Sequence, residues 1–130
     1  MEMNSTQTSA FLPIPAPIPA ESVFSDRFRI HAVTGDSMEP TLKARRDYVL
    51  LAPVCTYVGE GIYVFSQDVW MDFYRVTPNL DGKGNLRLFR DNKQYQDLIV
   101  TREQFEEGVV GFVVAEIKVK NERFLREAMQ

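Results

Sequence analysis

The 130-residue chain has a single cysteine and a single histidine, and its positive and negative charges nearly balance. One cysteine excludes an internal disulfide and any metal site built from several cysteines, which fits a reducing cytoplasm. Fifteen Lys and Arg against 18 Asp and Glu give a net charge of −3, whereas a nucleic-acid-binding domain is usually basic. The composition therefore argues against direct nucleic-acid binding by this chain.

Long hydrophobic runs are also missing, since none approaches the roughly 20 residues that a membrane-spanning helix needs. The N-terminus carries Glu2 where a signal peptide would be basic, and no long apolar stretch follows. We therefore expect a soluble, cytoplasmic protein without a membrane association. Hydrophobic residues at 45% and aromatics at 12% are enough for one globular domain with a sizeable core.

Proline is scarce except near the N-terminus, where four of the seven prolines alternate with other residues between Pro13 and Pro19. Each proline removes a backbone donor and fixes φ, which prevents a helix or a central strand. The pattern predicts that residues 1–22 form an extended or disordered arm. Apolar side chains such as Phe11 and Ile14 leave open that the arm docks on its own domain or on a partner.

Residues 23–120 show the pattern of one mainly β domain. Short alternating or apolar segments indicate strands, at 28–33, 48–52, 62–65, 69–76, 86–89, 98–100 and 109–117. The turn signal Asp81-Gly82-Lys83-Gly84-Asn85 predicts a hairpin. The last segment is almost entirely apolar, so we expect it to be buried on both faces or to pair with another chain.

Helix signals are few. Thr101 and Gln104 fit a capping box, with Gly108 as a stop, and predict a short helical turn. The tail, residues 121–130, forms a second short helix if Asn121 caps it.

The most informative segment is Gly35-Asp36-Ser37-Met38-Glu39-Pro40-Thr41-Leu42. A strand enters it, Gly35 permits a tight turn, and Pro40 prevents an immediate return to regular structure. Ser37 is thus presented on a bend, where its hydroxyl could face a cleft as a nucleophile. A serine in a turn is more often only a turn former, so the segment alone leaves both interpretations open.

This segment resembles the serine motif of the LexA-like (S24) peptidases, which include self-cleaving phage repressors and UmuD-type polymerase subunits. Four further segments continue the resemblance: Asp47-Tyr48-Val49-Leu50-Leu51, Gly61-Ile62-Tyr63-Val64-Phe65, Arg90-Asp91-Asn92-Lys93-Gln94-Tyr95 and Val110-Gly111-Phe112-Val113-Val114. The third is similar to a signature of the soluble, repressor-type branch. The resemblance covers about residues 30–117 and implies a LexA C-terminal fold, which is a bent, mostly antiparallel β structure with short helical turns.

The family implies a serine–lysine dyad, in which a buried neutral lysine takes the proton from the serine. By position, Ser37 is the nucleophile and Tyr74 occupies the lysine position, because Arg75 matches the residue that follows the lysine. A phenol titrates near 10 and is a poor base at neutral pH, although it could donate a hydrogen bond to Ser37. No lysine lies between Lys43 and Lys83, so a shift in register cannot restore the dyad.

Self-cleaving members cut an Ala-Gly or Cys-Gly bond before the serine domain, and neither dipeptide occurs here. These departures favour an inactive S24-like module in phage-type repression or a DNA-damage response. Such a module would form a homodimer through its C-terminal strands, or bind a protein or peptide segment in the serine cleft. Two alternatives stay open: an active S24 peptidase that uses Ser37 with an unconventional base, and a UmuD-like accessory subunit of a translesion polymerase. No cofactor or metal is expected, and His31 lacks the neighbouring carboxylate that a catalytic histidine usually has.

Overall fold

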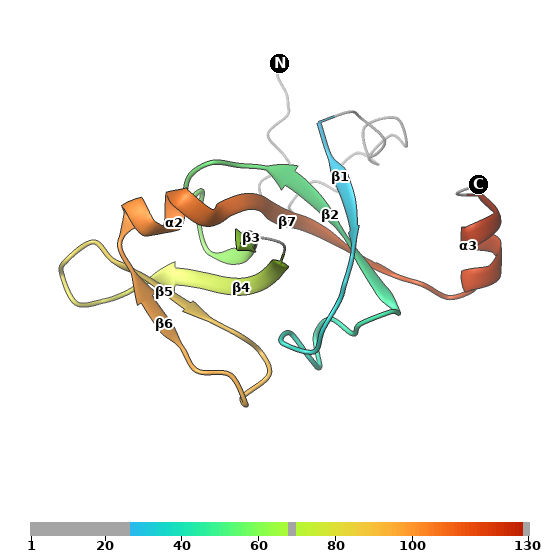
Figure 1. Ribbon diagram of the computed structural model, residues 1–130, viewed down its shortest axis with the longest axis horizontal. Helices are drawn as coiled ribbons and strands as arrows, with labels where there is room; N and C mark the ends of the chain where they lie inside the picture. Colours follow the sequence, from blue (N-terminus) through green and yellow to red (C-terminus); the bar gives the residue numbers. More distant parts are fainter. Residues whose placement is uncertain (1–26, 68–69, 129–130) are drawn as a thin grey trace, which may run out of the picture.

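The computed structural model describes residues 27–67 and 70–128 (Figure 1). Within these ranges the chain is mainly β, as the sequence predicted, with seven strands and two short helices. The strands are β1 (Arg29–Ala32), β2 (Asp47–Pro53), β3 (Gly61–Gln67), β4 (Trp70–Pro78), β5 (Leu86–Phe89), β6 (Leu98–Val100) and β7 (Val109–Lys118). The helices are α2 (Arg102–Gly108) and α3 (Glu122–Ala128). The predicted arm at 1–22 lies outside the described residues.

The seven strands form one antiparallel sheet in the order β1-β2-β7-β3-β4-β5-β6. β7, the last strand in the sequence, lies in the middle of the sheet between β2 and β3 (Figure 1). Its register shifts opposite Leu50 and Leu51 of β2 and again opposite Val64 and Phe65 of β3. Such irregularities increase the local twist and bend a strand. The predicted hairpin is confirmed, because β4 pairs with β5 across the turn that contains residues 81–85.

β7 is less buried than its apolar sequence predicted. Val109 is buried, but Val110 and Val114 are 39% and 44% exposed. The pairing of β7 with β3 ends at Phe112. Beyond that residue, β2 is the only described strand that pairs with β7. For the described residues the expectation of burial on both faces is therefore wrong, and the second half of β7 also extends past β3. Pairing with another chain stays a prediction.

Two clusters of buried side chains lie on opposite faces of the sheet. Ile62 and Val64 of β3 belong to the first cluster, and the alternating residues Tyr63 and Phe65 belong to the second. The first core cluster also contains Val33, Met38, Leu42, Val49, Leu51 and Phe73. The second core cluster also contains Tyr74, Val76, Leu86, Leu88, Phe105 and Val109.

Helix α2 begins with the predicted capping box, in which the side chains of Thr101 and Gln104 each accept a hydrogen bond from the other's backbone N–H. It ends at the predicted stop, Gly108. Its Phe105 is 1% exposed and meets the rings of Tyr63 and Phe65 edge-on, with centroid distances of 5.1 and 5.2 Å. This contact fixes α2 against the second core cluster.

The tail helix α3 is also confirmed, and the Asn121 side chain accepts a hydrogen bond from the backbone N–H of Phe124 at 3.4 Å. Over the residues that the structure describes, no helix has the length and apolar character needed to cross a membrane.

Candidate functional site

The serine turn, residues 34–42, connects β1 to the loop before β2, and two of its own apolar side chains anchor it in the core. Met38 and Leu42 are 1% and 0% exposed in the first core cluster, and the backbone N–H of Leu42 donates to the carbonyl of Met38 at 2.9 Å. Gly35 has φ +78°, a left-handed conformation that glycine adopts without strain. Ser37 is 7% exposed. The turn thus places a nearly buried hydroxyl at a fixed position.

The loop after β5 also holds the serine turn, through hydrogen bonds from Asn92 and Tyr95. Asn92 donates from its backbone N–H to the carbonyl of Ser37 at 3.0 Å, and from its side-chain amide to the carbonyl of Asp36 at 2.9 Å. The Tyr95 hydroxyl donates to Asp36 Oδ1 at 2.5 Å, and this hydrogen bond raises the pKa of Tyr95. The Asp-Asn…Tyr signature that carried part of the family resemblance therefore contacts the serine turn directly.

Asp91, the first residue of that signature, joins three segments. It accepts two hydrogen bonds from the guanidinium of Arg75 on β4, at 2.6 and 2.9 Å, and one from the hydroxyl of Thr41 in the serine turn. The hydrogen bonds from Arg75 hold the pKa of Asp91 below its ordinary value. Asp91 therefore links the loop after β5 to β4 and to the serine turn.

Lys118, at the end of β7, contacts both the serine turn and Asp47 at the start of β2. Lys118 Nζ donates to Asp47 Oδ2 at 2.8 Å and to the carbonyl of Thr41 at 2.7 Å. Burial by itself raises the pKa of Asp47, but the hydrogen bonds from Lys118 and from the backbone of Lys43 outweigh it, so the pKa lies below its ordinary value. Lys118 and Asp91 thus both hold the serine turn at Thr41.

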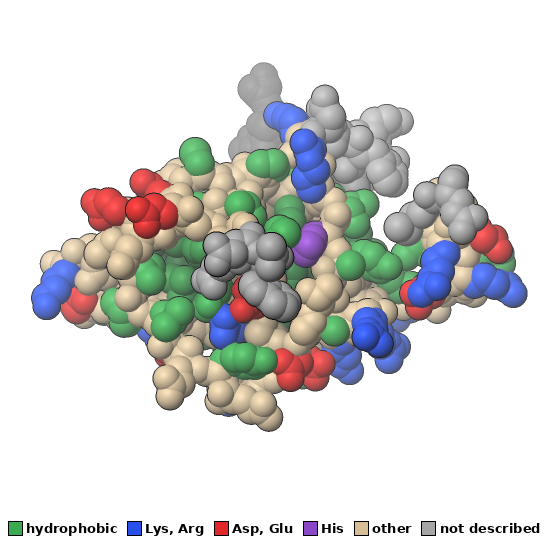
Figure 2. Space-filling model, in the orientation of Figure 1, with side chains coloured by type: hydrophobic (Ala, Val, Ile, Leu, Met, Phe, Trp, Pro, Cys, Tyr) green, Lys and Arg blue, Asp and Glu red, His purple; other side chains and the backbone are tan. Residues whose placement is uncertain are grey.

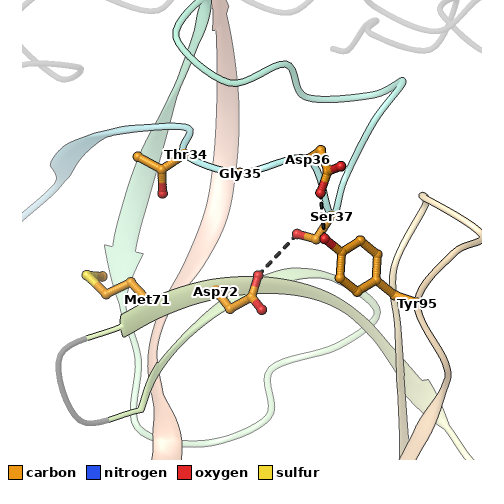
Figure 3. A pocket seen from close by; sticks show the side chains of 7 residues that line it. All are labelled: Thr34, Gly35, Asp36, Ser37, Met71, Asp72 and Tyr95. Carbon is orange, nitrogen blue, oxygen red and sulfur yellow. Dashed lines mark hydrogen bonds between the residues drawn. The ribbon is translucent and has the colours of Figure 1, made fainter.

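The hydroxyl of Ser37 faces Asp72, a residue of β4 that the sequence analysis did not single out. Ser37 Oγ donates to Asp72 Oδ1 at 3.1 Å (Figure 3). Arg90 donates from one guanidinium nitrogen to Asp72 Oδ2 and to the hydroxyl of Tyr74. Ser37, Asp72, Arg90 and Tyr74 thus form one connected polar network.

Tyr74 follows Asp72 by two residues, so both side chains are on the same face of β4. Its ring is 4% exposed, lies edge-on to Phe65 at 5.3 Å, and has the guanidinium of Arg90 4.0 Å above it. Burial, more than any other cause, raises the pKa of Tyr74, so its phenol stays neutral. The Tyr74 hydroxyl accepts a hydrogen bond from Arg90. The sequence suggested that this hydroxyl donates to Ser37, but Ser37 instead donates its own hydrogen bond to Asp72.

An open hollow of about 360 Å³ lies beside Ser37 (Figure 3). Its lining consists of Thr34, Gly35, Asp36, Ser37, Met71, Asp72 and Tyr95. The serine turn supplies one wall, β4 another, and the loop after β5 the third. Among the described residues, two carboxylates contribute to this lining, and no lysine or arginine does.

The other residues that the sequence brought up lie outside this lining. His31 is on β1 with its ring edge-on to Phe73 at 6.1 Å, and Figure 2 shows it as the purple side chain at the surface. Cys55 is free and exposed. Within the two described ranges, no three His, Cys, Asp or Glu side chains lie close enough together to hold a metal ion.

Whether Ser37 can act as a nucleophile depends on the group that its hydroxyl contacts. Within the described residues, the hydrogen-bond partner of its hydroxyl is a carboxylate and not an amine or an imidazole. A carboxylate is a far weaker base than a neutral amine, and Asp72 already accepts hydrogen bonds from Arg90 and from the backbone of Phe73. The hydroxyl is therefore poorly placed to lose its proton.

Comparison with protein-family models gives no match, and no curated protein matches the chain significantly. The S24 resemblance therefore rests on the motifs quoted above.

Proposed function

We propose that this chain is a non-catalytic S24-like module that binds an extended segment of a protein partner in the hollow beside Ser37. The observation that carries the proposal is the network at the dyad position, where Ser37 donates to Asp72 and Tyr74 accepts from Arg90. The context that the family resemblance suggests is regulation, in phage-type repression or in a DNA-damage response.

The network opposes hydrolysis for two reasons. A serine nucleophile needs a neighbouring base whose pKa is matched to the proton transfer. Tyr74 carries a neutral phenol whose pKa is raised further by burial, and Asp72 is held by the cation of Arg90. Neither Tyr74 nor Asp72 therefore supplies the neutral amine that activates the serine in S24 peptidases.

Binding has better support than catalysis. The serine turn is fixed by Asn92, by Asp91 through Thr41, and by Lys118. A surface that is already ordered loses less conformational entropy when it takes up a ligand. The hollow presents hydroxyl and carboxylate oxygens from several segments, which an extended peptide with N–H donors and a polar side chain can use.

Mass spectrometry of the intact protein tests the absence of catalysis. After prolonged incubation at high pH, and after treatment with a fluorophosphonate probe, we expect the wild-type mass to be unchanged, as in Ser37→Ala. An adduct or a self-cleavage product that forms in the wild type and is absent in Ser37→Ala would contradict the proposal. Its loss in Asp72→Asn as well would identify Asp72 as an unconventional base.

We also propose that two copies pair through β7, as the resemblance implies. Val114 is 44% exposed, and the described strands leave β7 beyond Phe112 with a neighbour only on its β2 side. An open strand edge with exposed apolar side chains is a surface that another strand can pair with.

Sedimentation velocity over a concentration series tests this contact. We expect the wild type to dimerise and Val114→Arg to weaken dimerisation by about tenfold or more, because an arginine would be placed in an apolar contact. Leu80→Arg is the matched control, since Leu80 lies in the turn after β4 and is 96% exposed. A wild type that stays monomeric, or equal effects of both variants, would rule out pairing through β7.

A further inference from the structure

The described side chains that line the hollow carry negative charge and no positive charge. Asp36 and Asp72 both contribute carboxylates to its lining, whereas its remaining polar side chains are the neutral hydroxyls of Thr34, Ser37 and Tyr95. The side chain of Met71, on a residue that is 40% exposed, supplies an apolar wall (Figure 3). The hollow thus combines acceptor oxygens with one apolar surface.

The two carboxylates differ in how far their charge is neutralised. Asp72 forms an ion pair with Arg90 and accepts hydrogen bonds from Ser37 and from its neighbour's backbone N–H. Asp36 accepts a hydrogen bond from Tyr95, which is a neutral donor, and no ion pair to it exists among the described side chains. Among the described side chains, the carboxylate of Asp36 therefore has no cation paired with it.

We propose that the hollow accepts a lysine or arginine side chain of the bound segment. This inference rests on the proposed peptide-binding function and names the side chain that the site selects. The cationic head would contact the carboxylate of Asp36, and its aliphatic stem would lie along Met71. The serine at the centre of the site then serves as a hydrogen-bonding group of a recognition pocket.

Charge complementarity also indicates where this side chain comes from. Residues 1–26 contain three acidic residues, Glu2, Glu21 and Asp26, and neither lysine nor arginine. Residues 1–26, which include the predicted arm at 1–22, therefore cannot supply a lysine or arginine side chain, and their charged side chains have the same sign as those of the hollow. The fitting occupant is a basic segment of a partner protein.

Titration of the ¹⁵N-labelled full chain with short peptides, followed by NMR, tests the inference. The peptides are acetylated and amidated Gly-Ser-Ala-X-Ala-Ser-Gly, where X is arginine, norleucine or glutamate. We expect the arginine peptide to shift the amide signals of Gly35 and Asp36 and to bind about fivefold more tightly than the norleucine peptide at low salt. The glutamate peptide should bind more weakly than both.

Two variants make the test specific. Asp36→Asn should lower the affinity for the arginine peptide about fivefold and leave the norleucine peptide unchanged. Glu107→Gln is the matched control, because it removes one exposed carboxylate from the acidic surface over α2 (Figure 2) and should change neither affinity.

The outcomes separate the two proposals. If the norleucine peptide binds as tightly as the arginine peptide, the peptide site stands and the preference for a cation is wrong. An arginine preference that survives Asp36→Asn would also overturn the inference. If none of the three peptides shifts the signals of the serine turn, the proposed peptide-binding function fails together with it.

Discussion

Replacing Tyr74 with lysine is expected to lower the free energy of unfolding by about 3 kcal/mol and to leave the chain unable to cleave itself. The ring of Tyr74 is 4% exposed and packs against Phe65, so a lysine leaves part of this space empty. The new ammonium would also lie beside the guanidinium of Arg90, which now sits 4.0 Å above the ring. Two cations in one buried site repel each other, which lowers the free energy of unfolding further.

Urea unfolding, together with the mass of the intact protein, measures both effects. Tyr74→Phe is the matched control, because it keeps the ring and removes only the hydroxyl that accepts from Arg90. We expect this control to lose about 1 kcal/mol. A Tyr74→Lys protein that is as stable as the wild type and cleaves itself would show that the site needs nothing more than a lysine to be active.

Asp91→Asn is expected to lower the free energy of unfolding at neutral pH by about 2 kcal/mol. Asp91 is 15% exposed at its side chain and accepts both hydrogen bonds of the Arg75 fork, in addition to that of Thr41. The neutral amide keeps the shape but loses the charge and one acceptor. Asp97→Asn is the matched control, because Asp97 pairs with Arg87 at the surface, 47% exposed, and should lose no more than about 0.5 kcal/mol.

The same variant should change how stability depends on pH. The pKa of Asp91 is lower in the folded chain than its ordinary value, so its contribution is complete above about pH 4 and is lost as the pH falls through the folded value. Below about pH 4 the wild type should therefore lose more stability than Asp91→Asn. Asp47, whose pKa is also lowered, should leave some acid sensitivity in the variant. Equal acid sensitivity of the two proteins would mean that the Arg75 pair contributes nothing to stability.

The sequence predicted those parts of the fold that local patterns determine. Alternation and turn residues located the strands and the hairpin at 81–85, and the residues at Thr101 and Gln104 located the start of α2. The exposure of β7 was not predictable in this way. Its apolar residues are the same whether β3 runs beside the whole strand or ends at Phe112, and only the tertiary arrangement decides between them.

At the candidate site the sequence brought forward Ser37 and Tyr74, but not the residues that connect them. Asp72 shares a face of β4 with Tyr74, and that two-residue spacing was the available signal. Nothing local to Arg90 indicated that its side chain would reach β4, since the two β4 residues that it contacts lie 18 and 16 positions earlier in the chain. Contacts of this kind depend on how β4, β5 and the following loop are placed beside one another.

The division of the interior into two core clusters separates position 74 from the anchors of the serine turn. Met38 and Leu42 anchor the serine turn in the first core cluster, whereas Tyr74 packs in the second, on the other face of the sheet. A mutation at position 74 therefore leaves the anchors of the turn in place. A substitution there can therefore change the hydrogen bonds around Arg90 while the buried anchors of the serine turn stay in place.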